Sequence, residues 1–171
     1  ESGSAKSGIS GQLLNQLNQM EGLILVVRGF NDDNVMHPNG SVDPLRDVDG
    51  MLSELLLNDL VAVERKLEKL IEERKKGGTD KTINARQTEL FEKINKTLSE
   101  DKPLRSMEFT NEEQKELSSC GLLTRKPVLI VFNMGEGQSA PAWEFESPSV
   151  VLQGKLEMEI AQLSPEDAEV F

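Results

Sequence analysis

The sequence predicts an α/β fold, in which part of a parallel sheet carries a long α-helical hairpin as an insertion. Two continuous apolar runs, residues 22–28 and 126–133, have the composition of buried strands in a parallel sheet. Between them, residues 44–98 show helical periodicity, interrupted by Gly77 and Gly78. Three predicted strands are too few for a closed doubly wound domain, so the chain taken alone indicates part of a larger fold.

Residues 1–43 are predicted to form the first part of this sheet domain. The stretch up to Gly11 is small and polar and is expected to be a flexible arm or a mobile loop. Leucines at helical spacing predict a helix from Gln12 to Met20, and the first strand follows it. Residues 31–41 are polar and rich in turn formers, which predicts a loop.

A long helical hairpin is predicted over residues 44–107. Asp43 can cap its first helix and Pro44 suits the first helical position, so this helix is expected to run to Gly77. A single apolar stripe in its second half predicts half of a coiled coil, and residues 80–98 are expected to return as the other half. The pair either fills surface or forms an arm that contacts a partner.

The hairpin tip is basic, and its cations are the candidate partner-contact residues: Arg74, Lys75 and Lys76. Such a cluster can serve solubility alone, or it can contact phosphates on RNA.

Residues 108–171 are predicted to complete the sheet domain. Thr110 and Glu113 have the spacing of a capping box, and the helix they start is expected to end near Gly121. A second strand, a short third strand at residues 149–152, a helix over residues 157–163 and another from Ser164 should follow.

Composition excludes several classes of function. The chain has 171 residues and a formal net charge of −11, which argues against nonspecific binding to DNA or to an anionic membrane. A single cysteine, Cys120, and a single histidine, His37, exclude a disulfide framework within the chain and most metal sites. No apolar run reaches the roughly 18 residues of a membrane span. We expect a cytoplasmic protein.

Asn133 and Glu136 form the strongest candidate for chemistry. They follow a predicted buried strand, and ligands of open α/β sheets bind at the carboxyl ends of the strands. An Asn and an acidic residue three positions apart can read the edge of a purine. A glutamate is one methylene longer than the aspartate that reads guanine and should weaken a preference for guanine, while Met134 offers an apolar lid to the base. A plain loop after a strand-terminating Asn remains the alternative.

Two other kinds of site are not expected. The sequence contains no G-x-x-x-x-G-K-[ST] motif, so phosphoryl transfer by this chain alone is not predicted and it is expected to be inactive by itself. Asp32, Asp33 and His37 crowd one loop and could bind a metal weakly, but such residues more often cap turns. No metal site is predicted.

Several segments together resemble the YchF / Obg-like ATPase family, over nearly the whole chain. They are residues 3–8 (GSAKSG), 26–34 (VVRGFNDDN), His37, 40–47 (GSVDPLRD), 54–55, 59–60, 63–70 (VERKLEKL), 122–124, 126–128, Asn133 and 154–160 (GKLEMEI). In that family a P-loop GTPase-type domain carries a helical coiled-coil insertion and is followed by a TGS domain. The resemblance covers the second half of the nucleotide domain and the helical arm, without the P-loop or the TGS domain.

This resemblance implies a function. It implies a nucleotide-binding protein that prefers ATP to GTP, hydrolyses ATP with Mg²⁺ when intact, and associates with ribosomes. The residues implied to lie at the base are Asn133, Met134, Glu136 and Gly154. Two alternatives stay open: a non-catalytic helical interaction module, and a degenerate family member without nucleotide binding. A half-domain also exposes a sheet edge and apolar surface, so self-association is expected.

Overall fold

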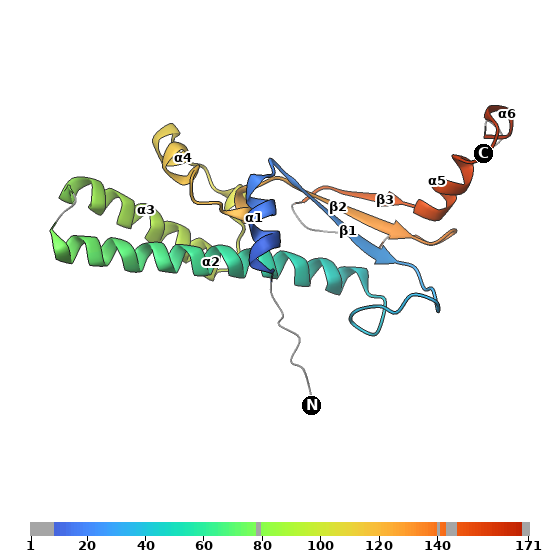
Figure 1. Ribbon diagram of the computed structural model, residues 1–171, viewed down its shortest axis with the longest axis horizontal. Helices are drawn as coiled ribbons and strands as arrows, with labels where there is room; N and C mark the ends of the chain where they lie inside the picture. The colour runs from blue at the N-terminus through green and yellow to red at the C-terminus, as the bar shows by residue number, and fades with distance from the viewer. Residues whose placement is uncertain (1–8, 78–79, 140, 143–146, 169–171) are drawn as a thin grey trace. The chain divides into compact units, whose positions relative to one another are not determined.

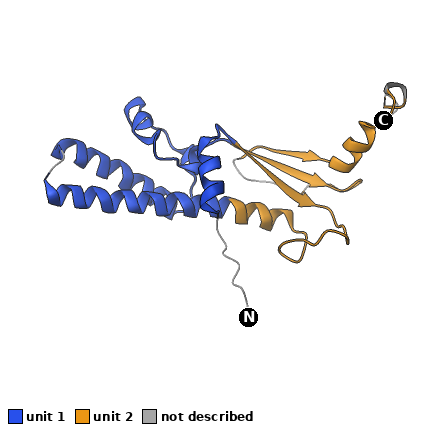
Figure 2. Ribbon diagram, viewed as in Figure 1, with its two compact units in different colours: residues 1–22, 52–127 blue, residues 23–51, 128–171 orange. Residues whose placement is uncertain are grey.

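The computed structural model of the chain describes residues 9–77, 80–139, 141–142 and 147–168, without the side chains of residues 165 and 166 (Figure 1). The chain divides into two compact units, coloured separately in Figure 2. Unit 1 comprises residues 1–22 and 52–127, and unit 2 comprises residues 23–51 and 128–171. The sequence predicts domain boundaries at residues 43 and 107, which differ in kind from the boundaries of these compact units. The predicted domain boundaries stay a prediction.

Unit 2 contains a three-stranded sheet in the order β1-β2-β3. The strands are β1 (Leu23–Gly29), β2 (Val128–Met134) and β3 (Ser149–Leu152), and both pairings are parallel. All three predicted strands are therefore present, and the predicted α/β fold with a parallel sheet is confirmed. The second strand begins at Val128 rather than Lys126, because Pro127 has no N–H to give to a ladder.

The two faces of this sheet differ in burial. Alternate residues of the central strand, Ile130 and Phe132, are almost completely buried. On the opposite face, Val131 of β2 pairs with Val26 of β1 and Val150 of β3, and these two neighbours are 55% and 46% exposed. Because side chains alternate along a strand, this face also carries further exposed apolar residues: Ile24 and Leu152. Unit 2 thus has one face that is buried over β1 and β2, although Val151 of β3 is exposed there, and one open apolar face.

Two short helices follow β3 in unit 2: α5 (Gly154–Ile160) and α6 (Pro165–Ala168). The predicted bounds of α5 were wrong, because the helix begins three residues before Glu157 and ends before Leu163. Its first residue, Gly154, donates its N–H to the side chain of Asn133, a long-range contact that has no signature in the local sequence.

Unit 1 is built from helices that include the predicted hairpin. The long helix α2 (Pro44–Lys76) contributes its residues from Leu52 onward, and α3 (Lys81–Ser99) runs beside it (Figure 1). Smaller elements complete the unit: α1 (Gly11–Gln19), the 3-10 turn η1 (Leu104–Ser106), α4 (Asn111–Leu117) and the 3-10 turn η2 (Leu123–Arg125). One cluster of buried residues joins α2, α3, η1, α4 and the residue before η2: Val63, Leu70, Leu90, Phe91, Ile94, Leu98, Leu104, Leu117 and Leu122.

The hairpin begins and turns as the sequence predicts. Asp43 Oδ1 accepts the backbone N–H of Arg46 at 3.1 Å, which caps α2, and Asp80 caps α3 through the N–H of Thr82 at 2.8 Å. Gly77 adopts a φ of +72°, which favours glycine, whereas the predicted partner in the turn, Gly78, lies outside the described residues.

A buried carboxylate links the middle of α2 to η2 within unit 1. Asp59 is 2% exposed and accepts the N–H groups of Leu123 and Thr124 at 2.8 and 2.7 Å and the Thr124 hydroxyl at 2.6 Å. Burial raises the pKa of Asp59, and these hydrogen bonds oppose that shift only in part. The carboxylate therefore serves as the N-terminal cap of η2.

The capping box of α4 is present. The Thr110 N–H donates to Glu113 Oε2 at 2.7 Å, and the Glu113 N–H donates to Thr110 Oγ1 at 3.3 Å. The helix ends at Leu117, earlier than predicted, and the chain then turns toward Gly121, whose φ is +61°. Among the helices in the described part of the chain, none combines the length and apolar character that crossing a membrane requires.

Candidate functional site

The carboxyl ends of β1 and β2 bring their last residues together. Arg28 pairs with Asn133 and Gly29 pairs with Met134, and Asn133 also pairs with Leu152 at the end of β3. In a parallel sheet the residues that end adjacent strands lie at one edge, where ligands of open α/β sheets bind. The candidate base residues Asn133 and Met134 therefore lie at this edge of the sheet in unit 2.

The side chain of Asn133 has a fixed orientation. Its Oδ1 accepts the N–H of Gly154 at 3.1 Å, so the amide oxygen faces the first residue of α5. A Cβ on residue 154 would lie 3.0 Å from this oxygen, closer than a side chain tolerates without displacing Asn133. The structure thus brings Asn133 and Gly154 into direct contact, and glycine suits that contact.

Met134 lies against the end of β1. It is 7% exposed, and its sulfur and methyl group occupy the space that a Cβ on Gly29 would need. The absence of a side chain at Gly29 therefore gives room to the Met134 thioether.

Glu136 lies beyond the end of β2 and is exposed. It belongs to a turn that is closed by hydrogen bonds between Gly135 and Gln138. The backbone position of Glu136 is therefore set by this turn rather than by the strand.

A cavity of about 460 Å³ lies at this edge of the sheet. It is lined by twelve residues: Phe30, Asn31, Asp32, Asn34, Asn133, Met134, Gly135, Glu136, Gln153, Lys155, Leu156 and Glu159. Three of the four predicted base residues line this cavity. The fourth, Gly154, does not line it but donates its N–H to the side chain of Asn133. This volume lies in the usual range for small-molecule sites.

The loop after β1 supplies lining residues that the sequence interpretation did not identify as part of a base site. Arg28 donates to three carbonyl oxygens of this loop, those of Phe30 at 2.8 Å, Val35 at 2.8 Å and Asp32 at 3.2 Å. Its guanidinium also lies 4.9 Å from the centroid of the Phe30 ring. The local sequence signal for this arrangement is an arginine near the end of a buried strand and an aromatic residue two positions later.

Asp32 is the charged group of this loop that faces the cavity. Its Oδ1 accepts the backbone N–H and the side-chain amide of Asn34 at 2.9 and 3.1 Å. These bonds, with weaker contributions from the charges of Arg28 and Lys155, hold the pKa of Asp32 below its usual range. The cavity therefore has an ionised carboxylate on one side at neutral pH, with Lys155 near it.

Asp32 and His37, two of the residues considered as metal ligands, contact different partners. Asp32 is bonded to Asn34, whereas His37 Nε2 lies 3.0 Å from Asp47 Oδ2 and its Nδ1 accepts the N–H of Asn39. In the ranges that the structure describes, no three His, Cys, Asp or Glu residues gather where they could hold a metal ion.

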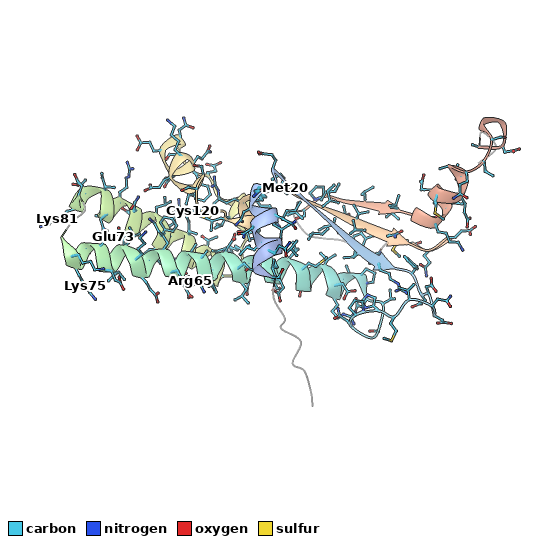
Figure 3. All side chains as sticks on the ribbon, viewed as in Figure 1. Met20, Arg65, Glu73, Lys75, Lys81 and Cys120 are labelled. Atoms are coloured by element: carbon cyan, nitrogen blue, oxygen red, sulfur yellow. The ribbon has the colours of Figure 1, made fainter. Side chains whose placement is uncertain are left out.

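The basic residues of the hairpin tip lie in the last turn of α2, in unit 1. Arg74, Lys75 and Lys76 are exposed in its last turn, and Lys76 Nζ lies 3.5 Å from Glu72 Oε2 (Lys75 is labelled in Figure 3). Cations in a last helical turn also interact favourably with the negative end of the helix dipole. They therefore stabilise α2 and are available to an anionic partner.

Known proteins are similar in sequence to this chain over most of its length. No protein-family model matches the chain. The "Ribosome-binding ATPase YchF" of Bacillus subtilis is 32% identical over 177 residues, which is 96% of this chain and 48% of that protein. The "Obg-like ATPase 1" of Schizosaccharomyces pombe is 34% identical over 75% of this chain and 34% of its own length.

A solved structure is similar over the same extent. The structure described as "Structure of the Schizosaccharomyces pombe YchF GTPase" superimposes with a TM-score of 0.75 and 25% identity, and the match covers 98% of this chain and 49% of that one. The chain thus spans about a third to a half of the lengths of these relatives. By the similarity of its sequence and of its fold, this chain belongs to the YchF / Obg-like ATPase family.

Proposed function

We propose that this chain supplies the purine-base site of a YchF-like nucleotide-binding protein, with ATP preferred over GTP. The observation that carries the proposal is the fixed amide of Asn133, whose oxygen is held by the Gly154 N–H beside a cavity of about 460 Å³. Met134 and Glu136 line the same cavity, so all four predicted base residues belong to one arrangement.

The amide of Asn133 has the chemistry to read a purine. Adenine presents N7 as an acceptor and N6 as a donor on its Hoogsteen edge, and an Asn amide can bond both. Within the described residues no hydrogen bond engages Nδ2 of Asn133, so it can donate to N7, and Oδ1 keeps a second lone pair for the N6 amino group while it accepts from Gly154. Guanine carries the O6 acceptor where adenine has the N6 donor. Guanine O6 would therefore face Oδ1 of Asn133, and neither oxygen can donate a hydrogen bond.

Titration of the 171-residue chain with ADP, ATP and GTP, with and without Mg²⁺, tests this proposal. Asn133→Asp keeps the acceptor for Gly154 and removes the donor to N7, so we expect ADP to bind about 10-fold more weakly. Asn15→Ala, on the exposed face of α1 in unit 1, is the control and should leave binding unchanged. Equal affinity of the unmodified chain for adenine and guanine nucleotides, or no binding at millimolar concentration, would contradict the proposal.

The intact protein is proposed to hydrolyse ATP with Mg²⁺ and to associate with ribosomes in the cytoplasm. The support is the relatives' names, which include "Ribosome-binding ATPase YchF" for the proteins of Bacillus subtilis and Haemophilus influenzae. Hydrolysis requires a phosphate cradle, and the 171 residues contain no such motif. The contribution of these residues is recognition of the base.

A second candidate function is partner binding by the helical hairpin, and the exposed cations at the end of α2 favour it. Reversal of all three charges, R74E with K75E and K76E, should weaken binding to ribosomes and lower its salt dependence. The matched control is K96E on α3, which changes the charge away from the tip. Ribosome binding with an unchanged salt slope in the triple variant would rule out a contact at the tip.

A further inference from the structure

We propose that Gln138 is a positioning residue for base selectivity, which acts by fixing the turn that carries Glu136. This inference rests on the proposed function of the cavity and extends it to a residue outside the cavity lining. Gln138 is not among the residues that line the cavity in the described part of the chain, so its effect is indirect.

The turn is closed by a reciprocal pair of hydrogen bonds. The backbone N–H of Gln138 donates to the carbonyl oxygen of Gly135 at 3.1 Å, and the N–H of Gly135 donates to Gln138 Oε1 at 2.8 Å. Gly137 completes the turn with a φ of +69°, a conformation that favours glycine. The side chain of Gln138 thus satisfies the backbone group that follows the last residue of β2.

The closed turn leaves no room for a side chain at Gly135. A Cβ on residue 135 would lie 2.8 Å from Gln138 Oε1 and 3.3 Å from the Cβ of Phe30. The amide oxygen of Gln138 and the ring-bearing residue of the neighbouring loop therefore approach the same backbone position. Gln138 and the cavity residue Phe30 therefore both border the position of the Cβ that Gly135 lacks.

Glu136 depends on this closure more than Asn133 does. Asn133 is held by the ladder of β2 and by Gly154, whereas Glu136 is exposed and lies two residues beyond the strand. Without the Gln138 acceptor, the turn would sample other conformations and the backbone of Glu136 would shift relative to Asn133. The consequence is a loss of discrimination between purines rather than a loss of purine binding.

The test compares three variants by the ratio of the dissociation constants for GDP and ADP. Gln138→Met removes the acceptor at nearly constant size and should lower this ratio about 3- to 10-fold. Gln138→Glu restores an acceptor and should keep the ratio within about twofold of the unmodified chain. Gln16→Met, an exposed glutamine of α1 in unit 1, is the control and should change nothing.

Two further measurements separate a positioning role from a general loss of structure. Amide exchange of the Gly135 N–H, followed by NMR, should accelerate in Gln138→Met and stay slow in Gln138→Glu, because only the first variant lacks the acceptor. In the background of Glu136→Ala, Gln138→Met should have no further effect on the ratio, because both changes act through the same side chain.

The outcomes distinguish this inference from the function on which it rests. If the unmodified chain binds no nucleotide or shows no preference, the proposed function fails and the role of Gln138 fails with it. If the unmodified chain prefers adenine but Gln138→Met keeps the ratio within twofold, or weakens both nucleotides equally, only the role of Gln138 is wrong. Unchanged exchange of the Gly135 N–H in Gln138→Met would likewise overturn it.

Discussion

At the scale of single residues, a histidine–aspartate pair holds the loop after β1 to the first turn of α2. Asp47 receives hydrogen bonds from Asn39 and Arg46 and lies 3.0 Å from His37 Nε2. Partial burial opposes ionisation of Asp47, but the bonds from Asn39 and Arg46 outweigh it and keep the pKa of Asp47 below 3.8.

The sign of the resulting pH dependence follows from this lowered pKa. The folded chain binds a proton at Asp47 less readily than the unfolded chain does, so the stabilisation is present above about pH 4 and is lost as the pH falls through and below 3.8. Asp47→Asn should therefore destabilise the chain by about 1 kcal/mol at pH 6 and by much less at pH 3. Urea unfolding at both pH values checks this, with Asp49→Asn as the control, and an equal loss at both would contradict it.

The pH dependence of stability that we expect from Asp59 has the opposite sign to that expected from Asp47. Burial raises its pKa in the folded state, so its contribution to stability increases as the pH falls from 7 toward 3.8. Asp59→Asn turns an amide N–H₂ group toward the N–H donors of Leu123 and Thr124, and about 1–3 kcal/mol of stability should be lost at neutral pH. The stability difference between the unmodified chain and this variant should widen between pH 7 and pH 4, measured by urea unfolding. A difference that narrows would show that Asp59 has a lowered pKa instead.

At the scale of elements, the capping box of α4 gives the clearest prediction. Thr110→Ala removes the acceptor for the Glu113 N–H and should cost about 1 kcal/mol. The pKa of Glu113 is held below 4.5 by the Thr110 N–H, so this cap weakens as the pH falls through that range. Thermal unfolding followed by circular dichroism at pH 7 is the measurement, and Thr82→Ala, on an exposed surface of α3, is the comparison. Equal melting temperatures for Thr110→Ala and the unmodified chain would show that α4 is stabilised by packing alone.

The elements differ in how far their bounds follow from the sequence. The start of α2 was predictable because Asp43 and Pro44 act locally, and its end because Gly77 can adopt a positive φ. The start of α5 was not, because Gly154 is held by Asn133, twenty-one residues away. Local signals fix the ends of helices when the cap is close in sequence, and they fail when the cap comes from another strand.

The same distinction applies to the candidate site. Asn133 and Glu136 could be selected because they follow an apolar run, and Gly154 because of the resemblance to a family. The lining residues Phe30 and Asp32 could not, since Arg28 places them through three bonds to backbone carbonyls. Such bonds depend on the path of a loop, which residue types alone do not specify.

At the scale of the whole molecule, the open apolar face of the sheet predicts self-association. Ile24 and Val26 are 66% and 55% exposed, and parallel sheets are usually covered on both faces. The double variant I24T with V26T, which keeps β-branched side chains, should lower the sedimentation coefficient at high protein concentration toward that of a monomer. Val35→Thr, an exposed valine of the loop after β1, is the control. Sedimentation that is independent of concentration in the unmodified chain would contradict the prediction.

The continuity of α2 has a consequence for how the chain loses its structure. Residues 44–51 of this helix belong to one compact unit and residues 52–76 to the other, so a single ladder of backbone bonds runs through the boundary. Gly50 lies beside that boundary with open space where a Cβ would be. Gly50→Ala should therefore strengthen the helix there by about 1 kcal/mol and sharpen calorimetric melting into one transition. The strength of the helix that the two units share would then depend on one glycine, beside which a methyl group has open space.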